Sequence, residues 1–189
     1  QLPTAPLDWK YGLHERTAQF VYFFRRYPDY GRQQAGYAGF AGLDWLRDWI
    51  DSTRVREADL DHLRAQKDQA GRRRFDEGFL SWLAETGGFG SVSIRSVPEG
   101  RVVHGHEPIS VVEGPLAVAQ ILETSFLNHL NYQTLVATKA SRVAEAAAGG
   151  PVLEFGMRRG PDVGANAGAR AALIGGADAS SNVGASTAM

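Results

Sequence analysis

Two stretches near the end of the chain combine residue types that could bind a flat anion. Residues 151–159 (PVLEFGMRR) run from apolar residues into an aromatic ring, a glycine and two arginines. Phe155 offers a ring face for stacking, and the arginines offer a positive fork for a carboxylate or phosphate. Residues 172–182 (ALIGGADASSN) end a second apolar run with glycines, Asp178 and Ser180. The two patterns predict successive buried strands whose ends build an α/β active site.

Each of these side chains also has a purely structural interpretation. Phe155 could be a core ring at the end of a strand, and Asp178 could be a turn residue or a helix cap. Adjacent strand residues point to opposite faces, so one of Arg158 and Arg159 would form a structural salt bridge. We favour Arg158 as the inward residue, because it lies three positions after Phe155.

Composition excludes several classes of protein. The chain has 189 residues, of which 43% are hydrophobic and 22% charged, as is usual for a globular protein. A net charge of −1 gives no basic field for a nucleic-acid partner. No apolar run approaches the roughly 20 residues that span a bilayer, so we expect no membrane partner. The absence of cysteine fits a reducing compartment, and we expect a cytoplasmic protein.

The first part of the chain predicts a mixture of strands and helices. Apolar periodicity favours helices, whereas alternation after residue 91 favours a hairpin around residues 98–100 (PEG). The predicted strands are 19–27, the two hairpin arms within 91–103, and 109–112; the predicted helices are 39–52, 57–66 and 75–85.

The second part predicts alternating helices and strands. A helical region opens at residues 114–115 (GP) and continues to residue 148, which is long enough that we expect a break near residues 128–131. A strand, a helix over residues 166–172 and another strand follow. This order favours a parallel sheet or barrel. We therefore predict two domains, residues 1–112 and 113–189.

Six sequence blocks, in order, resemble the amino-terminal half of the nicotinate phosphoribosyltransferases. The combination is specific to that family, although each block alone would be a weak signal. The blocks are residues 23–26 (FFRR), 40–43 (FAGL), 123–128 (ETSFLN), 131–138 (NYQTLVAT), 154–159 (EFGMRR) and 174–182 (IGGADASSN).

The resemblance implies an activity and a fold. Enzymes of this family transfer phosphoribose from phosphoribosyl pyrophosphate to nicotinate, with ATP as co-substrate and Mg²⁺ bound mainly through pyrophosphate. The product, nicotinate mononucleotide, enters NAD biosynthesis. The implied fold is α/β: an amino-terminal α/β domain and an irregular TIM-like barrel of the type II phosphoribosyltransferases, of which this chain would hold the first part. The resemblance also implies a homodimer with shared active sites.

The resemblance implies roles for the residues singled out above. Phe155 and Arg158 would lie in the pocket for pyridine and phosphate, while Arg159, Asp178 and Ser180 would also bind substrate. Arg26 would reach phosphate across the dimer, although a solvated strand end is the plainer interpretation. We see no dense carboxylate cage, so we expect no metal site built by the protein itself.

The chain departs from the family at both ends. It starts at what resembles the Gln-Leu of a family segment, so that segment's pyridine-stacking tyrosine is absent, and the phosphorylatable histidine is expected beyond Met189. We therefore expect a partial chain that is inactive by itself, and the sequence leaves the catalytic residue unassigned. Two alternatives stay open: a nicotinamide-specific phosphoribosyltransferase, or a non-catalytic interaction module that keeps the fold.

Overall fold

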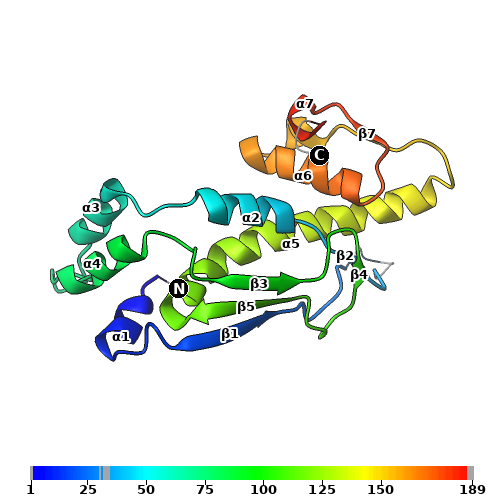
Figure 1. The fold of residues 1–189 in the computed structure, drawn as a ribbon. Helices are drawn as coiled ribbons and strands as arrows, with labels where there is room; N and C mark the ends of the chain where they lie inside the picture. Colours follow the sequence, from blue (N-terminus) through cyan, green and yellow to red (C-terminus); the bar gives the residue numbers. More distant parts are fainter. Residues whose placement is uncertain (1, 30, 32–34, 187–189) are drawn as a thin grey trace. The chain divides into compact units, whose positions relative to one another are not determined.

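The chain divides into two compact units that interleave along the sequence. The structure is a computed structural model and describes residues 2–29, 31 and 35–186 (Figure 1). Unit 1 comprises Gln1–Val21, Arg47–Arg95 and Val111–Ser125; unit 2 comprises Tyr22–Leu46, Ser96–Ser110 and Phe126–Met189. We predicted two domains, residues 1–112 and 113–189, that follow each other along the chain. The two units alternate along the sequence, so they do not test this division, and it stays a prediction.

Three short helices build the core of unit 1. They are α1 (Ala5–Lys10), α3 (Glu57–Ala65) and α4 (Glu77–Thr86). Asp76 caps α4 by accepting a hydrogen bond from the amide of Phe79 at 2.8 Å, which satisfies a free donor of the first turn. Apolar side chains at helical spacing then meet in one buried cluster: Ala5, Leu60, Leu63, Phe75, Phe79, Leu80, Leu83 and Ala117.

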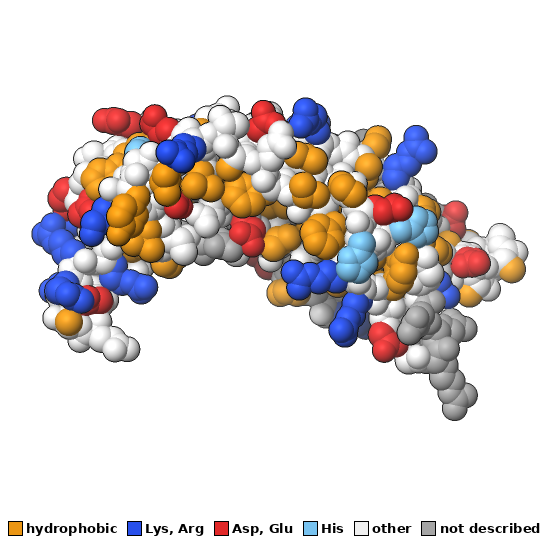
Figure 2. Space-filling model, turned by 90° about the horizontal axis from the view of Figure 1, so that it is seen from below, with side chains coloured by type: hydrophobic (Ala, Val, Ile, Leu, Met, Phe, Trp, Pro, Cys, Tyr) orange, Lys and Arg blue, Asp and Glu red, His pale blue; other side chains and the backbone are white. Residues whose placement is uncertain are grey.

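A three-stranded sheet with the order β1-β5-β3 completes unit 1. Its strands are β1 (Thr17–Tyr22), β3 (Ser93–Ser96) and β5 (Ser110–Pro115). On the edge strand β1, Phe20 is 36% and Val21 is 49% exposed. Figure 2 shows the molecule from below, and hydrophobic side chains are visible at the surface on that side.

In unit 2, a row of hydroxyl groups on the helix α5 (Leu116–Ala146) holds the extended segment 37–41. Thr134 bonds both the amide and the carbonyl of Ala41 at 3.2 Å, and Thr138 accepts the amide of Gly39 at 2.9 Å. Ser141 bonds the phenol of Tyr37 at 2.9 Å. Residues 134, 138 and 141 share one helical face, and the two threonines satisfy backbone groups of residues 39 and 41.

The last part of unit 2 is a β–α–β unit. It runs through β6 (Leu153–Glu154), the 3-10 helix η1 (Gly156–Arg159), α6 (Asp162–Ile174), β7 (Ala179–Ser180) and α7 (Val183–Ser186). β6 and β7 are parallel neighbours, as the alternating pattern predicts. The mixed architecture confirms the α/β expectation.

Several predicted elements differ from the structure. The strand predicted over residues 19–27 lies at Thr17–Tyr22, and the helix predicted over residues 166–172 is longer, at Asp162–Ile174. The predicted helix over residues 39–52 begins at Leu43 (α2, Leu43–Ser52), because Ala38–Gly39 form the strand β2. The predicted hairpin is wrong: β2 pairs antiparallel with β4 (Val102–Val103), and β3 lies beside β5. The expected break near residues 128–131 is also wrong, since α5 is one helix of 31 residues.

Candidate functional site

The parallel pair β6–β7 brings the two predicted chemical blocks together. Leu153 stands opposite Ala179, and Glu154 stands opposite Ser180. Both strands end at the same edge, because parallel strands share one direction. The block after Glu154 and the block around Ser180 therefore meet at the carboxyl ends of neighbouring strands, which is where α/β proteins place ligands.

The strand that leads into the first block is not buried, contrary to the prediction. Leu153 is 56% exposed and Phe155 is 47% exposed. β6 is two residues long, and within the described residues its partner is β7. Arg158 and Arg159 lie in η1 and not in the strand, so strand alternation does not decide which of them faces a ligand.

Asp178 and Ser180 hold the two strands in register. The carboxylate of Asp178 accepts a hydrogen bond from the amide of Val152 at 2.8 Å. The amide of Asp178 donates to the carbonyl of Val152 at 2.9 Å. Ser180 donates its hydroxyl to Glu154 at 2.7 Å. Both side chains therefore have structural partners, and their contact with substrate stays a prediction.

Glu154 also belongs to this site, although its residue type and position did not predict that role. Its second carboxylate oxygen accepts the amide of Gly156, so one side chain joins β7 to the first turn of η1. This contact turns the chain directly after Phe155. The available signal was a carboxylate inside an otherwise apolar strand, a position where a charged side chain needs a partner.

A cavity of about 200 Å³ lies beside this turn within unit 2. Arg159 and Glu154 border it, whereas Phe155 and Arg158 do not; Phe155, Arg158 and Arg159 are all exposed. The phenol of Tyr132 comes so close to α6 that a Cβ at position 168 would lie 2.7 Å from its oxygen. The lining residues are Tyr132, Val136, Glu154, Gly156, Arg159, Gly160, Ala165, Gly168, Ala169 and Ala172.

Arg26 borders a different cavity of unit 2, of about 210 Å³. There the phenol of Tyr22 donates to the side chain of Asn131 at 2.9 Å, and Phe24 and Thr134 contribute to the wall. The structure thus does not place Arg26 in the cavity that Arg159 and Glu154 border.

Burial raises the pKa of Tyr22 to about 12, from an ordinary value of 10.0. The folded chain therefore binds this proton more tightly than the unfolded chain. The resulting stability is complete below pH 10 and is lost as the pH rises through 12. In an alkaline titration followed by circular dichroism, we expect the free energy of unfolding to fall across this window, and Tyr22→Phe to lack that fall. An identical alkaline limb in both proteins would contradict this.

Comparison with known sequences decides the family of the chain. The family model of the nicotinate phosphoribosyltransferase (NAPRTase) N-terminal domain matches residues 2–131. The chain belongs to the nicotinate phosphoribosyltransferase family. It is 42% identical over 184 residues to the nicotinate phosphoribosyltransferase of Bacillus subtilis, covering 97% of this chain and 35% of that protein. It is 36% identical to the nicotinate phosphoribosyltransferase of Caenorhabditis elegans, covering 93% of this chain and 30% of that protein.

Solved structures agree with this assignment. The human nicotinic acid phosphoribosyltransferase matches with a TM-score of 0.79 and 34% identity, covering 95% of this chain and 34% of that chain. The nicotinate-nucleotide pyrophosphorylase of Pyrococcus furiosus, with a TM-score of 0.68 and 22% identity, covers 100% of this chain and 38% of that chain and shares the fold. The expected type II phosphoribosyltransferase fold is thus confirmed, and the chain spans about a third of the length of these relatives.

The family implies a Mg²⁺ ion, and carboxylate side chains are the groups of the protein that could hold it. Among residues 2–29, 31 and 35–186, no three His, Asp or Glu side chains stand close enough to hold a metal ion. Asp178 and Glu154 each already accept hydrogen bonds from backbone amides. The binding of Mg²⁺ through pyrophosphate oxygens stays a prediction.

The length and apolar character of the described helices can be compared with those of a membrane-spanning helix. None of them combines the length and apolar character that crossing a bilayer requires.

Proposed function

We propose that the protein transfers phosphoribose from phosphoribosyl pyrophosphate to nicotinate, coupled to ATP hydrolysis, and so supplies nicotinate mononucleotide for NAD biosynthesis. The observation that carries the proposal is the parallel pairing of β6 with β7, which joins the blocks 154–159 and 178–182 at one strand edge. In a member of this family, that edge offers a ring face, a guanidinium group and hydroxyls for one ligand.

The chemistry needs positioning more than proton transfer. The ring nitrogen of nicotinate forms a bond to the anomeric carbon of ribose while the bond from that carbon to a pyrophosphate oxygen breaks. The electron pair of the broken bond leaves with pyrophosphate, and the ring nitrogen gains the positive charge. The protein must therefore align a flat nucleophile and neutralise phosphate charge.

Phe155 and Arg158 suit these two tasks. Phe155 is 47% exposed at the strand end, so its face is free to stack on a pyridine ring. Arg158 is exposed two residues into η1, where its fork can bind a carboxylate or a phosphate. Arg159 is exposed as well and borders a helix-lined cavity beside Glu154, so it would bind substrate less directly than Arg158. Asp178 and Ser180 would orient the substrate from the neighbouring strand.

The remaining partners of the reaction come from outside these two blocks. Arg26 would contact phosphate in the site of a second subunit, which agrees with its position in a separate cavity. This arrangement requires a homodimer with shared sites. Mg²⁺ would supply charge neutralisation on pyrophosphate, and ATP would act through the phosphorylated histidine that the family carries in a later segment.

Loss of the ring at position 155 should weaken nicotinate binding. We expect Phe155→Leu in the full-length protein to raise the Kd for nicotinate about fivefold, because an aromatic pair contributes roughly 1 kcal/mol beyond its buried area. Phe155→Tyr keeps the ring and is the matched control, with an affinity near that of the wild type. Calorimetric titration measures both, and equal affinities in the leucine and tyrosine variants would rule out stacking.

The proposed reaction is tested by supplying its substrates to the full-length protein. With nicotinate, phosphoribosyl pyrophosphate and Mg²⁺, we expect nicotinate mononucleotide and pyrophosphate in equal amounts, and faster turnover when ATP is added. Chromatography separates the nucleotide from the free base. No nucleotide under any of these conditions would show that the protein keeps the fold without the activity.

A further inference from the structure

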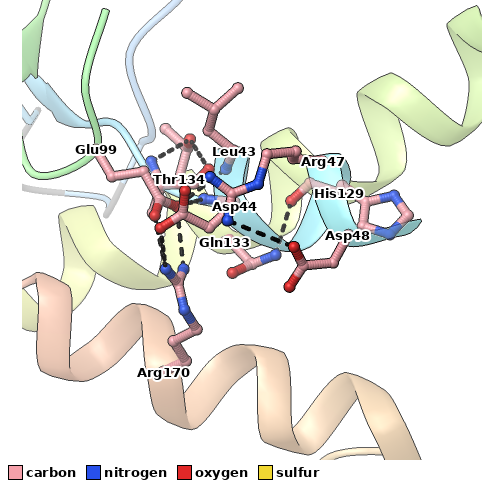
Figure 3. A network of polar contacts seen from close by, with 11 residues as sticks. Leu43, Asp44, Arg47, Asp48, Glu99, His129, Gln133, Thr134 and Arg170 are labelled. Carbon is pink, nitrogen blue, oxygen red and sulfur yellow. Dashed lines mark hydrogen bonds and ion pairs between the residues drawn. The ribbon is translucent and has the colours of Figure 1, made fainter. Parts of the chain in front are cut away.

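Unit 2 contains a buried ion pair outside the strand edge described above. Arg170 of α6 is 6% exposed, and its two terminal nitrogens contact the two carboxylate oxygens of Glu99 at 3.0 and 2.6 Å. One of these nitrogens also lies 3.2 Å from the carboxylate of Asp44. Figure 3 shows Arg170 reaching from its helix toward both carboxylates. Such a two-pronged contact fixes orientation as well as distance.

Glu99 serves a second set of partners at the start of α2. Its carboxylate accepts the amide of Leu43 at 2.9 Å and also the amide of Gly42. An anion at this place satisfies free amide donors and interacts favourably with the positive end of the helix dipole. The first turn of α2 within unit 2 is thereby tied to α6 through one carboxylate.

Charge explains why the carboxylate stays ionised. Burial alone would raise the pKa of Glu99, but the hydrogen bond and charge of Arg170 and the amide of Gly42 lower it below its ordinary value. A buried ion pair is weak support for stability, because desolvation offsets most of its attraction. We therefore look for the effect of this ion pair in the positions of the elements that it joins.

The ion pair restrains the position of α6. The helix follows η1, which carries Arg158, and precedes the strand that carries Ser180. It also packs against η1, β6 and β7. Any shift of α6 would displace the ring and guanidinium block on one side and the hydroxyl block on the other.

We propose that Arg170 is a positioning residue for phosphoribosyl transfer, acting through its ion pair with Glu99 to fix α6 and the two blocks that flank it. This inference rests on the proposed function. It concerns residues outside both blocks, since Arg170 lies within α6 and Glu99 lies between β3 and β4.

The test separates positioning from stability by removing both charges together. In the full-length protein, Arg170→Met alone leaves Glu99 buried without its counter-ion and should destabilise the fold. The double variant Glu99→Gln/Arg170→Met removes the unpaired charge, keeps an oxygen for the amides at α2, and should unfold near the wild-type temperature. We expect kcat/KM of the double variant to stay on the order of 10²-fold below wild type. Recovery of kcat/KM together with stability would overturn the inference.

Hydrogen exchange provides a readout that does not depend on activity. We expect faster amide exchange at residues 155–159 and 178–182 in the double variant, with unchanged exchange in α4 of unit 1. The same comparison in Arg170→Lys, which keeps the charge but loses the fork, covers the case in which the double variant does not fold. Unchanged exchange at both blocks would overturn the inference. If the exchange differences between the wild type and the variants are as expected but the wild-type protein forms no nucleotide, the proposed function is refuted instead.

Discussion

Replacing Arg158 with alanine in the full-length protein is expected to lower kcat/KM by about 10²- to 10³-fold, the usual effect of losing one donor aimed at charge in a transition state. We choose Arg158 over Arg159, which is exposed as well, because Arg158 lies three positions after Phe155 and both follow the end of β6. Arg158→Lys should recover only part of the loss, because an ammonium group lacks the planar fork. Steady-state kinetics with nicotinate and phosphoribosyl pyrophosphate measure both effects.

Arg159 is the matched control, since it is the adjacent residue of the same type. Its side chain is exposed too, but it also borders the cavity shared with Glu154 and helix α6, which Arg158 does not. We expect Arg159→Ala to change the unfolding temperature more than the turnover. Equal kinetic losses in the two alanine variants would show that the arginines act as one group, and a loss confined to Arg159→Ala would reverse their roles.

Replacing Gly42 with alanine should destabilise the fold by about 3 kcal/mol or more, as backbone strain and overpacking add. Gly42 has a φ of +106°, and a Cβ there would collide with the carbonyl oxygen of His129 and lie 3.2 Å from the side-chain nitrogen of Gln133. The amide of Gly42 also bonds Glu99, so the residue cannot move away freely. Chemical denaturation of the full-length protein measures the effect.

Gly149 separates the strain of the backbone from the collision. Its φ is +89°, but nothing lies within 4 Å of the position that a Cβ would take. We expect Gly149→Ala to cost about 1 kcal/mol, the penalty of a left-handed backbone alone. Similar losses at both positions would show that the contact with His129 adds nothing.

Local pattern was sufficient for helices that build their own apolar face. The predicted helices 57–66 and 75–85 match α3 and α4 to within two residues, because their apolar residues enter one core cluster. The break expected in α5 was wrong for a tertiary reason. Asn131 and Thr134 interrupt the apolar pattern, but they bond Tyr22 and Ala41, so polar residues inside this helix serve long-range contacts.

The predicted hairpin failed because its turn has a distant partner. Residues 98–100 were expected to pair the flanking strands with each other. Instead the amide of Gly100 bonds the carbonyl of Phe40, the amide of Phe40 bonds the carbonyl of Arg101, and Glu99 pairs with Arg170. Glu99 alone contacts residues 56 to 71 positions away along the chain, and no local pattern encodes such contacts.

The candidate site was predictable as sequence blocks but not as contacts. The chemistry of Phe155 and the arginines could be inferred from residue type, and the parallel strands from element order. The partners of Asp178 and Ser180 could not, because they depend on which strand residues stand opposite each other. Glu154 and Arg170 were missed for the same reason: each appears as a single charge in an apolar run, and its partner lies elsewhere in the chain.

The most direct test of this account is the preference of the full-length protein for the acid over the amide. A guanidinium beside a stacking ring should bind nicotinate, which carries a carboxylate, more tightly than nicotinamide, which carries none. Calorimetric titration with each compound should give a lower Kd for nicotinate in the wild type and nearly equal Kd values in Arg158→Ala. Tighter binding of nicotinamide by the wild type, or a preference for nicotinate that survives Arg158→Ala, would contradict the account.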